Sequence, residues 1–83
     1  MFNSQEVDKE IYRARLHMAH IHNGAYYNAR VAELAREFKP QCANQQERDP
    51  LKMKLINAVD RKGERMQQGT AAQGHIVRVL SGN

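Results

Sequence analysis

Along the first 38 residues, apolar side chains recur every three or four positions, and this spacing predicts one helix over residues 5–38. The first stripe consists of Val7, Ile11, Ala14, Met18, Ile21, Ala25, Ala29 and Ala32. The second stripe consists of Tyr12, Leu16, Tyr27, Val31, Leu34 and Phe38. At about 100° per residue, the two stripes point in roughly opposite directions. We therefore expect one stripe to pack against the rest of the chain and the second stripe to contact another chain or a ligand.

The residues around this segment mark where the helix begins and ends. Asn3 suits an N-cap, and Phe2 with Val7 occupies the positions of a hydrophobic staple. Lys39-Pro40 predicts the end, because the residue before proline is pushed out of the helical region. Asn23-Gly24 is a turn signal that would instead divide the segment into a helical hairpin. The first stripe passes this dipeptide without losing phase, so we favour a continuous helix, bent at Gly24.

A second helix is predicted over residues 50–68. Asp49-Pro50 reads as an N-cap followed by the first helical position, and Gly69 marks the end. Its apolar face is formed by Leu51, Leu55, Ala58, Val59 and Met66. The remaining residues 69–83 form either a short third helix, started by Thr70 and Gln73, or an irregular and mobile tail. A β-branched run ends this segment, but no second strand is evident to pair with it.

The predicted fold is thus all-α. A long N-terminal helix of about residues 4–38 packs against a shorter basic helix of about residues 50–68, and the 83 residues form one domain. The hydrophobic fraction is 41%, the mean hydropathy is −0.78, and there is no tryptophan. Such a composition gives a thin core, and oligomerisation is a common remedy. We therefore expect an oligomeric helical bundle, most simply a dimer.

The same composition bears on location and redox chemistry. No apolar run approaches the roughly 20 residues of a membrane span, and the N-terminus has no basic segment followed by an apolar stretch. We therefore expect a cytoplasmic protein without membrane association. Cys42 is the single cysteine, so it has no internal disulfide partner, and its polar surroundings favour an incidental thiol over a nucleophile.

Positive charge is confined to one half of the chain. Residues 1–50 carry seven basic and seven acidic residues, whereas residues 51–83 carry six basic residues against Asp60 and Glu64, a net of +4. Excess positive charge favours a polyanionic or acidic partner. The candidate polyanion-binding residues are Lys52, Lys54, Arg61, Lys62 and Arg65. A solubilising helix face explains the same pattern equally well.

The remaining chemistry is sparse. His17 and His20 are three residues apart on one helical face, but nothing nearby completes a set of metal ligands, and His22 falls on another face. We therefore expect neither metal nor cofactor. The sequence contains no glycine-rich phosphate loop and no nucleophile elbow, so it predicts no enzyme.

The layout of two helices joined by a break that ends in Asp49-Pro50 is loosely similar in shape to the helical-hairpin subunits of bacterial secretion needles and rods. The likeness covers about residues 30–80. This chain lacks the proline-asparagine turn of those subunits and is more basic, so no family is assigned. Its small size and basicity also fit phage- or plasmid-encoded regulators and inhibitors.

The predicted function is binding. We expect a small, non-catalytic helical protein that self-associates and docks on a larger protein, as an adaptor or inhibitor. The alternative is a basic DNA- or RNA-binding regulator that uses residues 52–65. A structural subunit of a larger helical assembly is the second alternative.

Overall fold

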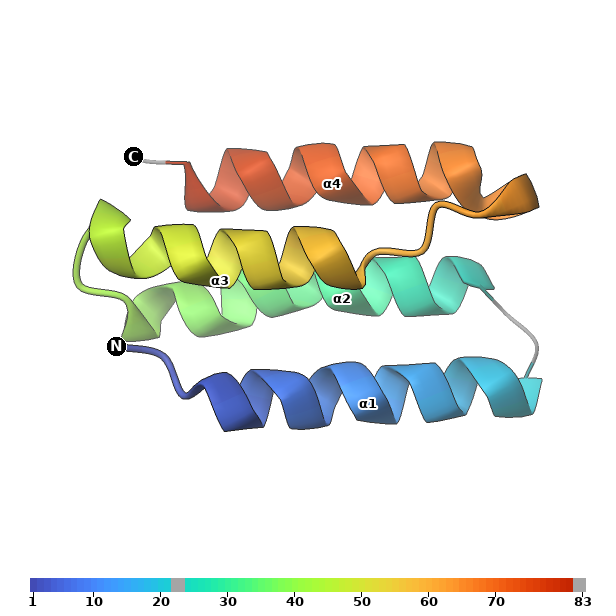
Figure 1. The fold of residues 1–83 in the computed structure, drawn as a ribbon, viewed down its shortest axis with the longest axis horizontal. Coiled ribbons are helices and arrows are strands. Elements are labelled where there is room, and N and C mark those ends of the chain that lie inside the picture. Colours follow the sequence, from blue (N-terminus) through green and yellow to red (C-terminus); the bar gives the residue numbers. More distant parts are fainter. Residues whose placement is uncertain (22–23, 82–83) are drawn as a thin grey trace.

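The computed structural model describes residues 1–21 and 24–81, and these residues form helices joined by short connections. The elements are α1 (Ser4–Ile21), α2 (Gly24–Phe38), the 3₁₀ turn η1 (Lys39–Gln41), α3 (Gln45–Ala58), the 3₁₀ turn η2 (Gly63–Arg65) and α4 (Met66–Leu80). Successive α-helices run in opposite directions (Figure 1). The described part of the chain contains no strand, so the predicted all-α class is confirmed.

The predicted continuous helix over residues 4–38 is wrong, because α1 and α2 fold back on each other as a hairpin (Figure 1). The disfavoured reading of Asn23-Gly24 was therefore the correct one. Gly24 begins α2, and Asn23 lies outside the described residues. The preserved phase of the first stripe across Asn23-Gly24 does not indicate one helix here, because each helix buries a different stripe. From the first stripe, α1 buries Val7 and Ala14, whereas α2 buries the part of the second stripe from Tyr27 onward.

The predicted helix ends around α1 and α2 are confirmed. The side-chain oxygen of Asn3 accepts hydrogen bonds from the backbone N–H groups of Gln5 and Glu6 at 3.0 and 3.2 Å. Phe2 and Val7 are both buried, as a hydrophobic staple requires. At its C-terminal end, α2 stops at Phe38, directly before Lys39-Pro40.

The second helix differs from its predicted range of 50–68. It begins at Gln45, capped by Asn44, whose side chain accepts from the Glu47 backbone N–H at 3.1 Å. Asp49-Pro50 therefore does not start the helix, and Pro50 lies inside it. The helix ends at Ala58, because Val59 is extended with φ −64° and ψ 137°.

The C-terminal segment is a helix, and it starts at Met66, four residues before the predicted Thr70. Gly69 lies inside this helix and is buried. The prediction that Gly69 ends a helix is therefore wrong. A Cβ atom at Gly69 would collide with the Asp60 carbonyl and the Arg61 side chain. The glycine therefore lets α4 approach the connection that precedes it.

The core lies between α2, α3 and α4, with α1 added at one side. Figure 1 shows α1 and α4 on opposite sides of α2, which contacts all three other α-helices. The fully buried residues include Val31 and Leu34 of α2, Leu51 and Leu55 of α3, and Ile76 and Leu80 of α4. The resulting slab measures 36 × 23 × 15 Å. One chain thus buries the α2 part of the second stripe, which the continuous-helix prediction had assigned to an interface with another chain.

Polar contacts fasten α1 to its neighbours. The guanidinium of Arg30 in α2 donates to Glu10 of α1 at 3.0 Å and to Glu37 at 2.7 Å. It also donates to Glu33 at 3.2 Å. The hydrogen bond to Glu37 is the main cause of the raised pKa of Arg30, against which burial acts. A second link joins Lys54 of α3 to Asp8 of α1 at 2.6 Å.

Candidate polyanion-binding site

A cleft of about 360 Å³ lies where the connection between α3 and α4 meets α1 and α2. We call it the basic cleft. It is lined by Arg15, Met18, Tyr27, Asn57, Ala58, Val59, Asp60, Arg61, Lys62 and Arg65. Its walls therefore come from three helices and from the connection, so no contiguous segment of the sequence contains it.

Asn28 holds the connection in place. Its side chain is 2% exposed, and its carboxamide makes two hydrogen bonds with the backbone of Asp60. The Asn28 Nδ2 donates to the Asp60 carbonyl, and the Asp60 N–H donates to Asn28 Oδ1, each at 2.9 Å. Both backbone groups of Asp60 are thereby satisfied away from a helix. The connection is tied to α2 by a buried contact.

Tyr27 positions the arginine that α1 contributes to the cleft. The Tyr27 hydroxyl donates to the Ala58 carbonyl at 2.5 Å and accepts from Arg15 Nη2 at 2.9 Å. The Arg15 guanidinium also lies over the Tyr27 ring, 5.5 Å from its centroid, which is a cation–π geometry. These partners are neutral, so they position the Arg15 guanidinium without offsetting its positive charge.

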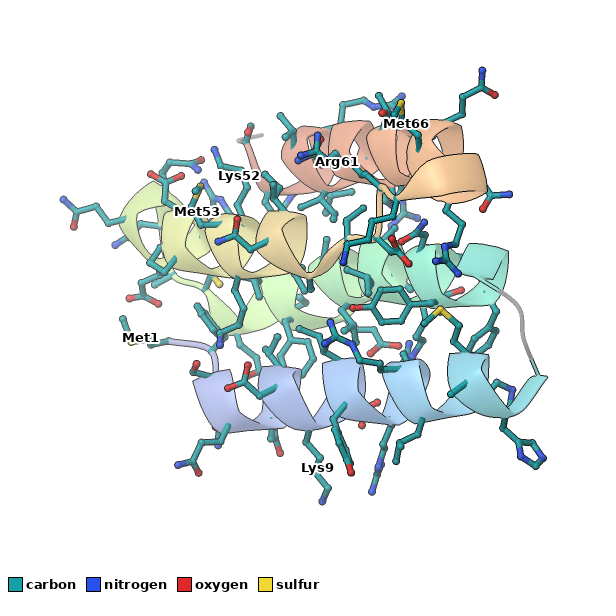
Figure 2. The ribbon with its side chains drawn as sticks, turned by 45° about the vertical axis from the view of Figure 1, so that its right-hand side comes forward. Met1, Lys9, Lys52, Met53, Arg61 and Met66 are labelled. Carbon is teal, nitrogen blue, oxygen red and sulfur yellow. The ribbon has the colours of Figure 1, made fainter. Side chains whose placement is uncertain are left out.

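The connection and η2 supply the other cations. Arg61 Nη1 donates to Gln73 Oε1 at 2.9 Å, again a neutral partner, and Figure 2 shows Arg61 beside α4. Arg65 pairs with Asp60 at 2.9 Å, and Lys62 is exposed. Four cationic side chains against the Asp60 carboxylate give the lining a formal charge of 4 − 1 = +3. The cleft can therefore attract and hold an anion.

The structure brings together three of the five predicted polyanion-binding residues: Arg61, Lys62 and Arg65. The other two do not line the cleft. Lys54 is paired with Asp8, and Lys52 lies on α3 near Asp49 and Ser81, at 3.5 and 3.3 Å (Figure 2). Arg15 was missed, because it belongs to the half of the chain with no net charge and only the hairpin places it here. No local sequence signal marks it.

The predicted interface residues occupy two different environments. Tyr27, Val31, Leu34 and Phe38 belong to the core of the single chain. Tyr12 and Leu16 lie on α1 and remain 63% and 53% exposed. The two halves of the second stripe therefore no longer form one surface.

The histidine cluster and the cysteine have ordinary surroundings. His17 and His20 are exposed, and His22 lies outside the described residues. The His17 ring contacts the Tyr26 ring in a tilted arrangement, with a centroid distance of 4.5 Å. Within residues 1–21 and 24–81, no group of three or more potential ligands is arranged to hold a metal ion. Burial raises the pKa of the Cys42 thiol, which disfavours the nucleophilic thiolate.

The described helices include none that is both long and apolar enough to cross a membrane. Comparisons of the chain with protein-family models, curated proteins and solved structures found no match.

Proposed function

We propose that this protein is a non-catalytic helical binding protein that contacts the phosphate groups of nucleic acid through the basic cleft. The observation that carries the proposal is that Arg15, Arg61, Lys62 and Arg65 line one cleft whose lining includes a single acidic residue, Asp60. Arginine and lysine are the usual donors to phosphate oxygens, and arginine presents a planar fork of donors. The sequence predicted nucleic-acid binding by residues 52–65 as an alternative, and Arg15 of α1 is added to that site here.

The geometry favours binding without base recognition. Tyr27 is the aromatic residue that lines the cleft, and it is 1% exposed with its hydroxyl engaged, so its ring has no free face for a base. Contacts to phosphates position a nucleic acid but carry no sequence information. We therefore expect similar affinity for different sequences and a steep dependence on salt.

The test compares two charge-matched double variants by fluorescence anisotropy with a short DNA duplex. Arg61→Gln with Lys62→Gln removes two charges from the cleft, whereas Lys9→Gln with Lys52→Gln removes two charges elsewhere. The cleft variant should bind more weakly and should lower the slope of log K against log salt by about 0.9 per lost phosphate contact. The matched variant should change both much less, with both folds checked by circular dichroism.

The Arg15→Gln variant tests whether binding depends on the folded cleft or only on the basic half of the chain. If the cleft is the site, this single change in α1 weakens binding although it lies outside the basic half of the chain. Equal losses in all variants would indicate that only net charge matters and would overturn the site. Undetectable binding of the unmodified protein at low salt would overturn the function itself.

A second candidate function is self-association through the outer face of α1, with docking on a larger protein through the same face. Tyr12 and Leu16 are one helical turn apart and largely exposed, which is the observation that favours it. Large exposed apolar side chains that lie together are typical of protein-binding surfaces. The earlier candidates Leu34 and Phe38 are unsuitable for testing it, since a charge there would disrupt the core.

Sedimentation velocity tests the self-association. Tyr12→Ser with Leu16→Ser should convert an oligomer into a monomer, whereas Met53→Ser should not, although Met53 is also 53% exposed. A monomeric unmodified protein at micromolar concentration would remove the self-association. The larger partner is then tested by loss of its capture in the Tyr12/Leu16 variant and retention in the Met53 variant.

A further inference from the structure

A second group of cations lies in a groove between α2 and α4. The groove has a volume of about 450 Å³ and is lined by Arg36, Lys39, His75, Arg78 and Val79. We call it the α2–α4 groove. It shares no residue with the basic cleft, and its lining includes no residue of α1 or α3. It is therefore a separate feature of the fold.

The cations of this groove are not neutralised. In the part of the chain that the structure describes, no carboxylate lies within ion-pair distance of Arg36, Lys39 or Arg78. By contrast, Arg30, Lys54 and Arg65 each form an ion pair with a carboxylate. Three cations held close together without a counter-charge repel one another, and a bound anion relieves that repulsion.

The nearest acidic residues are engaged elsewhere. Glu33 and Glu37 line an adjoining hollow of about 550 Å³ together with Arg36 and His75. Arg30 holds both carboxylates, at 3.2 and 2.7 Å. The lining of the groove itself contains the cations Arg36, Lys39 and Arg78 and no carboxylate, which is a formal charge of +3. The positive potential of the groove therefore survives its acidic neighbours.

The donors in the groove match a phosphate group. Two guanidinium groups and one ammonium group supply charged N–H donors, and the imidazole of His75 supplies another donor or acceptor. A guanidinium binds two oxygens of one phosphate at once, which a lysine cannot do. Two arginines facing one groove therefore favour a multiply charged phosphate over a single carboxylate.

We propose that the α2–α4 groove is a second anion-binding site, which takes a phosphate-bearing ligand through Arg36, Lys39 and Arg78. The ligand is either a free diphosphate or a phosphate of a nucleic-acid backbone, since both present the same oxygens. This site does not depend on the basic cleft. Its occupation would place a second phosphate contact between α2 and α4, and α4 lies on the opposite side of α2 from α1.

The experiment is a ¹H–¹⁵N NMR titration of the intact protein with inorganic pyrophosphate, compared with sodium chloride at equal ionic strength. Pyrophosphate should shift the amide and side-chain signals of residues 36–39 and 75–79, which surround the groove. Arg36→Gln with Arg78→Gln should weaken this binding by about tenfold or more, because two charge-assisted contacts are lost. Both residues are exposed, so the fold should survive.

Arg61→Gln with Lys62→Gln is the matched control, since it removes the same charge from the basic cleft and should leave the pyrophosphate shifts unchanged. An oligonucleotide without terminal phosphates forms the second arm. Shifts of the groove signals by the oligonucleotide identify a backbone phosphate as the ligand, and shifts by pyrophosphate alone identify a free diphosphate. If neither probe shifts these signals beyond the chloride control, or if the Arg36/Arg78 variant responds equally, the proposal is overturned.

The groove proposal and the basic-cleft proposal can fail independently of each other. The cleft variant reports on duplex binding, and the groove variant reports on pyrophosphate binding. Loss of one activity with retention of the other separates the two sites.

Discussion

The carboxamide of Asn28 joins two segments that lie 32 residues apart in the sequence. It is the buried polar side chain of the described core, and both of its polar ends are used. Such a residue is hard to replace, because a side chain without a carboxamide leaves the part-buried Asp60 backbone groups without these partners. Its position beside Tyr27 also makes it a support of the basic cleft.

We expect Asn28→Ala to lower the free energy of unfolding by about 2 kcal/mol, since two hydrogen bonds of about 1 kcal/mol each are lost. Urea denaturation followed by circular dichroism measures this change. Asn57→Ala is the control, because Asn57 is exposed on α3 and should cost little. An equal effect in the two variants would mean that the Asn28 contacts contribute nothing beyond helix propensity.

The two helical glycines of α4 should respond in opposite directions to the same substitution. Gly69→Ala places a Cβ atom against the Asp60 carbonyl and the Arg61 side chain, so the connection must shift. We expect a loss of about 1–3 kcal/mol in stability. Gly74 has open space around it, so Gly74→Ala should raise stability by about 0.5–1 kcal/mol through helix propensity. Thermal melting of both variants gives the comparison.

At the scale of the elements, the start of α3 shows how end residues fix a helix boundary. Two side chains, those of Asn44 and Glu47, accept backbone hydrogen bonds at the start of α3. The Ala43 backbone N–H donates to Glu47 Oε1 at 2.9 Å, while Asn44 accepts from the Glu47 N–H. α3 begins at this cap, and Asp49-Pro50 lies inside the helix. The first turn of α3 is thus set by side-chain hydrogen bonds.

Acid should weaken the start of α3 through Glu47. The hydrogen bond from the Ala43 backbone lowers the pKa of this carboxyl, with help from the N-terminal ammonium. Because the folded pKa lies below the unfolded value, the stabilisation is present above the unfolded pKa and is lost as the pH falls through the folded pKa. Glu47→Gln should therefore flatten the fall in stability below about pH 4.5.

Urea midpoints measured across the acid range provide the test. Glu6→Gln is the control, because Glu6 is exposed at the matching position of α1 and its carboxylate makes no hydrogen bond within the described residues. It should leave most of the acid dependence in place. A Glu47→Gln profile identical to that of the unmodified protein would contradict this role of the Ala43–Glu47 contact.

For the whole molecule, the peripheral place of α1 is the main feature. This helix packs chiefly on α2, whereas α2 and α4 contact each other and also α3 (Figure 1). Its outer face carries the exposed Tyr12 and Leu16. Local opening is easiest where few neighbours cover a helix. The element that contributes Arg15 to the basic cleft is therefore also the least enclosed.

Amide hydrogen exchange should be faster in α1 than in α2 and α4. We expect residues 12–18 to exchange through local opening and residues 31–38 and 72–79 to exchange only with global unfolding. Mass spectrometry of pepsin fragments after timed exchange measures the difference. A nucleic-acid ligand in the basic cleft should slow exchange in α1, because Arg15 would then be held from both sides. Uniform protection of all helices would show that α1 is as firmly packed as the rest.

Much of this fold follows from local sequence. The helical class, the Asn3 cap, the Phe2–Val7 staple and the stop at Lys39-Pro40 all involve residues within a few positions of one another, and all were predicted. The basic character of Arg61, Lys62 and Arg65 is likewise visible in the sequence. Short-range signals of this kind act through hydrogen bonds and sterics that do not depend on the rest of the chain.

What tertiary structure decided is which stripe each helix buries. A continuous helix and a hairpin are both compatible with the spacing from Ile21 to Ala25, and only the area buried by folding α2 back on α1 distinguishes them. That choice places Tyr27, Val31, Leu34 and Phe38 in one chain's core. It also carries Arg15 to the connection after α3 and brings Arg36 beside Arg78. Periodicity records faces within one helix, whereas pairing between helices depends on the whole chain packing at once.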